Sequence, residues 1–312
     1  MGKYTVQVGQ NLFDIALNLY GSIEGIVDLM MNNVNLSLAD TLKTGDTLEF
    51  TDDFVINPDV AAWYRMNNIV PSNGERNVYY KSSAFPPVFK IRLSSKLTSA
   101  GFGISGAGNM EIDWGDNSRV EALALCGNMK KLFHTFDNTV VDRRHILMYG
   151  DFTIKQADFT DLVADSILLF RPVPTEKFIL KDSKIRLDFM TLLKDVYEVN
   201  LTGAKPVSLL PLTTNKNLMK LDLSGVHIGQ EIVDEYLTQL VKKHNGRRSC
   251  TVTLTGNPSG QYREPDRDTN GNYHLTGGME AVWLLCNEPS WNEAGFWKFI
   301  INGQTYTSVN NS

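Results

Sequence analysis

The chain has 312 residues, and its 30 Lys and Arg residues face 35 Asp and Glu residues, for a formal net charge of −5 at pH 7. At this length we expect two to four domains. The charge is concentrated in residues 1–80, where four basic residues face ten acidic ones, a net −6. A mildly acidic chain without basic clusters argues against nucleic acid and anionic membranes as main partners. No segment approaches about 18 consecutive apolar residues, so no membrane insertion is expected.

Residues 4–50 carry the clearest pattern. An alternating strand begins at Tyr4, and a turn follows at Gly9. A helix is predicted from about Asn11, a suitable N-cap, to Gly21, a suitable helix stop. A second helix over 23–32 and a strand over 47–50 complete the order strand, helix, helix, strand. The predicted buried positions are Leu12, Ile15, Ala16 and Leu19 in the first helix and Ile26, Val27, Leu29 and Met30 in the second.

This stretch resembles a LysM module. The resemblance is carried by Tyr4-Thr-Val, Gly9-Gln-Asn-Leu-Phe-Asp-Ile-Ala, Leu19-Tyr-Gly and Leu42-x-x-Gly45-x-x-Leu48. Some LysM modules bind the N-acetylglucosamine of peptidoglycan or chitin, and others are packing modules in phage tail and baseplate proteins. The resemblance therefore implies either glycan binding or subunit docking. The residues expected to make these contacts are Gly9, Gln10, Asn11, Gly21, Ser22, Ile23 and Glu24.

Residues 53–80 extend the module formed by residues 1–52. A helix is predicted to begin after Asn57, with Pro58 at its first position. The turn-rich run over 69–74 is the predicted domain boundary, and a strand is expected over 78–80. With this extension, the N-terminal region resembles phage and prophage proteins of Bacteroidetes.

Residues 81–155 are predicted to be all-β, with a glycine-rich loop over 101–108. The run Met110-Glu-Ile-Asp-Trp-Gly-Asp resembles the Trp-Gly-Asp signature of PKD-like β-sandwich domains. His134-Thr-Phe and Tyr149-Gly-Asp-Phe-Thr-Ile lie where that family has further strands. Asp113 and Asp116 could form an acid–base or metal-binding pair. The favoured interpretation is a strand end and a hairpin turn, because Asp and Gly are common turn residues.

Residues 156–260 contain a repeat with one short apolar strand per unit. Periods of about 20 to 29 residues are typical of leucine-rich-type solenoids, in which each unit adds a strand to a parallel sheet. The segment resembles the irregular leucine-rich repeats of Bacteroidetes proteins. The longest gap holds a predicted helix over 228–245 with Ile232, Tyr236, Leu237 and Leu240 inward. The repeat anchors, spaced by 21, 21, 22 and 31 residues, are Phe159, Leu180, Leu201, Leu223 and Leu254.

Residues 261–312 are predicted to cap the repeat with a helix over 279–287 and a terminal hairpin that begins near residue 296. The aromatic residues Trp291, Phe296 and Trp297 could stack on a sugar, but cap core or a subunit contact is favoured. A calcium-loop pattern precedes the helix, but its twelfth position lacks a carboxylate, so an exposed turn without metal is favoured. The loop residues are Asp266, Asp268, Asn270 and Gly271, with Gly277 at the twelfth position and Glu280 three residues later.

The sequence offers no recognisable reaction. It lacks a Gly-x-Ser-x-Gly elbow, a phosphate-binding loop and a His-Glu-x-x-His motif. Cys126, Cys250 and Cys286 cannot all pair within one chain and form no Cys-x-x-Cys motif, so they are interpreted as free thiols. A nucleophile pair of Cys126 with His145 has no local support. No catalytic residue, cofactor or metal is therefore expected.

The sequence thus predicts a multidomain α+β protein with a LysM-like βααβ module, a PKD-like β-sandwich and a short leucine-rich-repeat-like solenoid with a C-terminal cap. The favoured function is a non-enzymatic structural component of a phage tail or baseplate that docks to other virion subunits in an oligomeric assembly. Because no hydrophobic signal region is seen, a virion protein made in the host cytoplasm is expected. The alternative is a peptidoglycan-binding LysM protein that displays an adhesion-type repeat domain.

Overall fold

The computed structural model describes residues 1–7, 9–40, 42–70, 81–116, 118–136, 144–293 and 295–308. The chain divides into two compact units near residue 80. We call them the N-terminal unit (residues 1–70 of the described chain) and the C-terminal unit (from residue 81). The predicted boundary over 71–74 and the predicted strand over 78–80 lie outside the described residues.

The N-terminal unit has the predicted order of strand, helix, helix and strand. β1 (Gly2–Thr5) pairs antiparallel with β2 (Thr47–Phe50), and between them lie α1 (Leu12–Tyr20), η1 (Ile23–Gly25) and α2 (Ile26–Asn32). Asn11 begins α1 because its side-chain oxygen accepts a hydrogen bond from the Asp14 backbone N–H, and the Asp14 carboxylate accepts one from the Asn11 backbone N–H. The core consists of Val6, Leu12, Ile15, Ala16, Tyr20, Ile26, Leu29 and Leu48.

The extension after residue 52 packs on this core, so the described part of 53–80 belongs to the same unit. It forms α3 (Pro58–Met66), which begins with Pro58 as predicted, and the Asn57 side chain caps it. The Tyr20 carbonyl at the end of α1 accepts hydrogen bonds from the backbone N–H groups of Ile56 and Asn57, at 3.0 and 2.8 Å. The start of α3 is thereby fixed to the end of α1.

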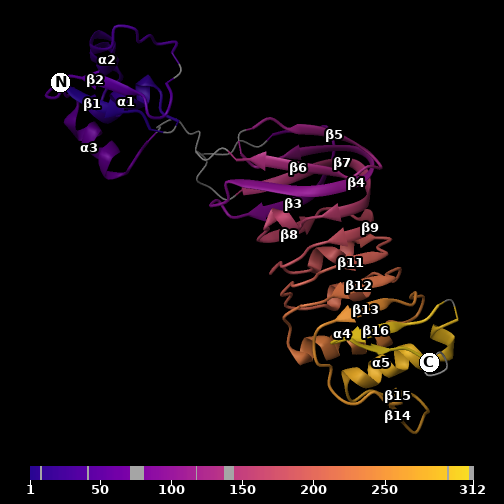
Figure 1. Cartoon of the computed structure of the whole chain (residues 1–312). Coiled ribbons are helices and arrows are strands. Elements are labelled where there is room, and N and C mark those ends of the chain that lie inside the picture. The colour runs from indigo at the N-terminus through magenta and orange to yellow at the C-terminus, as the bar shows by residue number, and fades with distance from the viewer. Residues whose placement is uncertain are drawn as a thin grey trace. The chain divides into compact units, whose positions relative to one another are not determined.

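One mixed sheet of 13 strands forms the C-terminal unit (Figure 1). Its strands are β3 (Pro87–Leu93), β4 (Ser99–Asp113), β5 (Glu121–Cys126), β6 (Lys130–Thr135), β7 (Arg144–Asp158), β8 (Ser166–Leu169), β9 (Val173–Ile179), β10 (Leu193–Lys194), β11 (Glu198–Asn200), β12 (Lys220–Leu223), β13 (Thr251–Leu254), β16 (Lys298–Ile301) and β17 (Gln304–Tyr306). The helical segments are η2 (Thr160–Leu162), η3 (Asp188–Leu192), η4 (Leu210–Thr214), α4 (Gln230–Lys242), α5 (Gly278–Asn287) and η5 (Pro289–Trp291).

The predicted division into a β-sandwich, a separate solenoid and a cap is wrong. β7 belongs to both regions: Arg144 to Met148 pair antiparallel with β3, whereas Ile154 to Asp158 pair parallel with β9. The sheet continues through β11, β12, β13 and β16 without a break, and one buried core runs from Val88 to Ile301. The physical reason lies in the edge strand. A separate sandwich would leave backbone N–H and C=O groups unpaired at its edge, and the parallel strands form hydrogen bonds with these groups.

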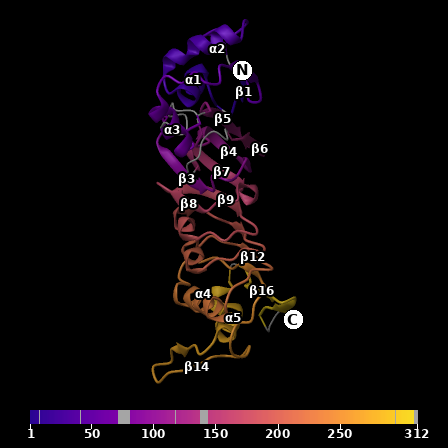
Figure 2. The ribbon, with the colours of Figure 1, turned by 90° about the vertical axis from the view of Figure 1, so that its left-hand side faces the viewer.

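The repeat phrases do form parallel strands. β9, β11, β12 and β13 pair in register, with Phe178, Val199, Leu221 and Val252 side by side. All five repeat anchors are buried. β16 adds one more parallel strand beside β13, and β17 turns back from it as the predicted terminal hairpin. Figure 2 shows β9, β12 and β16 following one another, with α4 and α5 near the C-terminal strands.

The predicted glycine-rich loop over 101–108 is instead the first half of β4. Glycine is required there because neighbouring backbone comes too close for a side chain. A Cβ on Gly106 would lie 1.9 Å from the carbonyl oxygen of Thr153. Close approach of a neighbouring strand is a known reason for glycine inside a strand.

Candidate functional site

The seven predicted contact residues do not share one exposed surface. Gln10 is only 5% exposed. Its side-chain oxygen accepts from the Gln7 backbone (2.9 Å), and its amide nitrogen donates to the Tyr4 hydroxyl (2.8 Å). Gly21 is buried, and the carbonyl oxygen of Asn57 occupies the place of a side chain. The prediction that Gln10 and Gly21 are exposed contacts is wrong, because both hold the fold of the unit.

The other predicted contacts are exposed or partly exposed, and two of them are helix caps. Asn11 caps α1, and Ser22 caps η1 by accepting from the Glu24 backbone. Gly9 is exposed in a left-handed turn with φ 76°. Only Ile23 and Glu24 combine exposure with a large side chain.

Ile23 begins a line of exposed apolar side chains that the sequence prediction missed. It continues with Val27, Met31 and Val34, and the exposed fractions are 54, 62, 76 and 93%. We call these four residues the α2 stripe. Val27 was predicted to be buried but is exposed, whereas Ile26 and Leu29 are buried as predicted. The available signal was the four-residue spacing of Val27 and Met31, which places both side chains on one face of α2, while Ile23 lies in η1 and Val34 follows the end of the helix.

Asp113 and Asp116 are buried, and each contacts a lysine or a histidine side chain. Lys81 donates to Asp113 at 2.7 Å, and the Gly115 backbone donates to the same oxygen. Asp116 lies 2.7 Å from Nε2 of His134, and the Ser118 backbone donates to its other oxygen. These contacts fit the favoured interpretation of a strand end and a turn.

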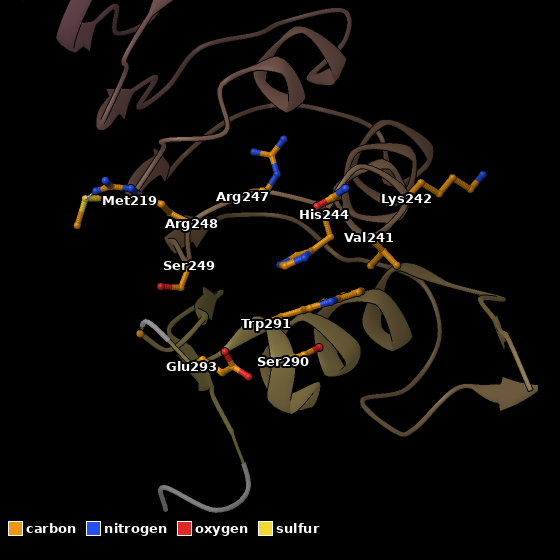
Figure 3. Close-up of a pocket in the computed structure, with 13 residues that line it drawn as sticks. Met219, Val241, Lys242, His244, Arg247, Arg248, Ser249, Ser290, Trp291 and Glu293 are labelled. Atoms are coloured by element: carbon orange, nitrogen blue, oxygen red, sulfur yellow. Dashed lines mark hydrogen bonds between the residues drawn. The ribbon is translucent and has the colours of Figure 1, made fainter.

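The largest cavity that we describe lies at the C-terminal end of α4 and has a volume of about 810 Å³. Figure 3 shows the His244 imidazole lying flat over the Trp291 indole. The ring centroids are 3.9 Å apart, and the planes differ by 11°. Lys242 and Arg247 point away from this stack (Figure 3), and the Arg247 guanidinium donates to the carbonyl oxygens of Thr213 and Asn215. The cations therefore do not converge on a ligand position.

The chemistry of this cavity is limited by His244. Burial, and then the positive charge of Arg247, lower the pKa of His244 to about 4. A general base works best when its pKa is near the operating pH, so this imidazole is poorly suited to catalysis near pH 7. We interpret the His244–Trp291 stack as packing that closes this end of the core.

The calcium-like loop is held by protein contacts. Asp268 accepts from the backbones of Asn270 and Asn272. Asp268 thus closes the turn between the short strands β14 (Asp266–Arg267) and β15 (Tyr273–His274). Arg263 pairs with Glu280 at 2.8 Å and with Asp266 at 3.5 Å. Gly277 caps α5. Among the described residues, no group of three or more His, Cys, Asp or Glu side chains is placed to hold a metal.

The remaining candidates are dispersed. Trp297 is 1% exposed and stacks on Phe299 in the core, whereas Phe296 is 56% exposed, so the aromatic residues form no shared platform. Cys126 pairs with Ala107 of β4, whose other partner is Thr153 of β7. His145 lies eight residues from Thr153 along β7, or about 26 Å at the rise of a strand. The two cannot act as a nucleophile pair.

No protein-family model matches this chain, and neither curated proteins nor solved structures give a match. Among the described residues, no helix has the length and apolarity needed to cross a bilayer.

Proposed function

We propose that this chain is a non-enzymatic structural component of a phage tail or baseplate, docked to other virion subunits through its N-terminal unit. The observation that carries the proposal is the α2 stripe. α2 buries Ile26 and Leu29 on one side and exposes Val27 and Met31 on the other. A soluble helix normally buries one apolar face and presents polar residues on the opposite one, so the exposed apolar side of α2 favours a partner that covers it.

Charge favours a different protein over a second copy as that partner. Residues 1–80 carry a net charge of −6, and Glu24 is exposed beside the stripe. Two copies that met through this face would bring like charges together, which opposes association. A subunit with an apolar centre and a Lys- and Arg-rich rim fits better.

The test compares matched charge substitutions in the full chain. Val27→Asp places a carboxylate in the stripe, and Val207→Asp places one at an equally exposed position of the C-terminal unit, since the exposed fractions are 62 and 64%. Mass spectrometry of purified particles should detect the wild-type chain and Val207→Asp at equal levels. Val27→Asp should be depleted at least about tenfold, because a charge at an interface centre costs more than about 1.4 kcal/mol.

Absence of the wild-type chain from all particles would reject the proposal. Normal incorporation of Val27→Asp into particles would show that the α2 stripe is not the docking surface. If the full chain also sedimented saturably with peptidoglycan, the glycan-binding alternative would replace virion docking.

A further inference from the structure

Three neighbouring strands of the C-terminal unit form a groove with a glycine floor. Gly103 of β4 pairs with Lys131 of β6 on one side and with Asp158 of β7 on the other. Gly101 pairs with Phe133. Because paired residues share a sheet face and the face repeats every second residue, these side chains stand on one face. We call the site the glycine groove and define it by Gly101, Gly103, Lys131, Phe133, Gln156 and Asp158, which all line one cavity of about 500 Å³.

Glycine makes the groove possible. The flanking strands β6 and β7 are two strand spacings apart, about 10 Å, and the strand between them contributes no side chain at these two positions. A Cβ on Gly103 would lie 3.2 Å from the sulfur of Met129 and 3.7 Å from Cβ of Asp158. A larger residue at Gly103 would therefore fill the space between the two walls.

The two walls have different chemistry. On one side, Phe133 is 72% exposed, which is unusual for a large apolar side chain on a strand. On the other side, the Gln156 side chain makes no hydrogen bond to the described residues, and Asp158 uses one oxygen for the Thr160 backbone. The register places Lys131 directly across Gly103 from Asp158, with Phe133 two residues further along β6 in one direction and Gln156 two residues further along β7 in the other. The aromatic face and the amide therefore lie diagonally across the groove, and the amide and one carboxylate oxygen are open to a ligand.

We propose that the glycine groove binds two consecutive sugar units of a neutral oligosaccharide. The C–H face of one pyranose ring packs on Phe133, and the hydroxyl groups of the next unit donate to Asp158 and exchange hydrogen bonds with Gln156. Lys131 and Asp158 lie directly across Gly103 from each other with opposite charges, and the Asp161 carboxylate also lines the cavity, so the groove does not select an anion. The volume lies within the range of small-molecule sites, about 300–1,000 Å³. This site is separate from the N-terminal unit and does not depend on virion docking.

The experiment is calorimetric titration of the full chain with chitotetraose, cellotetraose, maltotetraose and the acidic tetragalacturonate. At least one neutral tetrasaccharide should bind with a Kd of about 1 mM or tighter. Phe133→Ala should weaken that binding at least about tenfold. Gly103→Val, which fills the groove with a residue that strands accept, should abolish it. The matched control is Phe170→Ala, because Phe170 is also exposed (49%) but does not line the groove.

Three results would overturn the proposal. One is the absence of binding by all three neutral sugars, and another is a clear preference for tetragalacturonate. The third is unchanged binding by both groove variants, with circular dichroism showing that they are folded. Sugar binding that is lost in Val27→Asp but kept in Phe133→Ala would place the glycan site on the N-terminal unit instead.

Discussion

His244 is held as a neutral base in the folded chain. Its side chain is 8% exposed, and Nε2 has no hydrogen-bond partner among the described residues. Burial and the nearby Arg247 lower its pKa from 6.5 to about 4. Between these two values the unfolded chain binds a proton that the folded chain does not. The stabilisation is therefore complete above pH 6.5 and is lost as the pH falls toward 4.

We predict that His244 contributes to acid unfolding of the C-terminal unit. At about 1.4 kcal/mol per pKa unit, the loss is at most about 3 kcal/mol. His244→Phe keeps a ring over Trp291 but cannot take a proton. Urea unfolding at pH 7 and pH 4.5 should show that the wild type loses about 2 kcal/mol more than this variant. His227→Phe, at an exposed position, should behave as the wild type. An equal loss in all three proteins would contradict the prediction.

At the scale of elements, Gly21 joins α1 to α3. It ends α1 in the left-handed conformation with φ 68°. A Cβ at this position would lie 1.9 Å from the carbonyl oxygen of Asn57, the N-cap of α3. The glycine therefore serves two purposes, a helix stop and a close approach between two helix ends.

We expect Gly21→Ala to destabilise the N-terminal unit by about 3 kcal/mol, about 1 kcal/mol from the backbone conformation and the rest from the displaced Asn57. Gly45→Ala separates the two causes, because Gly45 has φ 93° but nothing within 4 Å of the new Cβ. It should cost only about 1 kcal/mol. Hydrogen exchange of the α1 and α3 amides, followed by mass spectrometry, measures the stability of the N-terminal unit independently of the C-terminal unit. Equal costs for the two variants would show that the α1–α3 contact adds nothing.

Individual elements were more predictable than their assembly. The N-cap Asn11, the helix start at Pro58 and the repeat anchors follow from local chemistry, and the structure confirms them. Val27 was misassigned because an apolar residue on a helix is taken as core, although α2 has two apolar faces. The groove residues Gly103 and Asp158 are far apart in sequence, so only the register of β4 with β7 brings them together. Glycines alone cannot reveal such a groove.

At the scale of the whole chain, the repeats and the C-terminal residues share one core. The prediction separated residues 261–312 as a cap because their pattern changes to a helix and a hairpin. In the structure, β16 is the neighbour of β13, with Phe299 beside Val252 and Ile301 beside Leu254. α5 packs against α4. Parallel pairing joins β13 and β16, which are more than forty residues apart in the sequence. The alternation of apolar residues within each strand does not indicate which distant strand it pairs with.

A chain that ends after residue 260 should therefore lose the cooperative fold of its C-terminal unit. The truncation removes Trp297, Phe299 and Ile301, and each buried side chain of this size stabilises by about 2–3 kcal/mol. It also exposes the edge of β13, which favours aggregation. Gel filtration and near-ultraviolet circular dichroism should show a loss of fixed aromatic packing, whereas a chain that ends at Ser308 keeps it. A monomeric truncated protein with a sharp thermal transition would instead mean that residues 81–260 fold without the last strands.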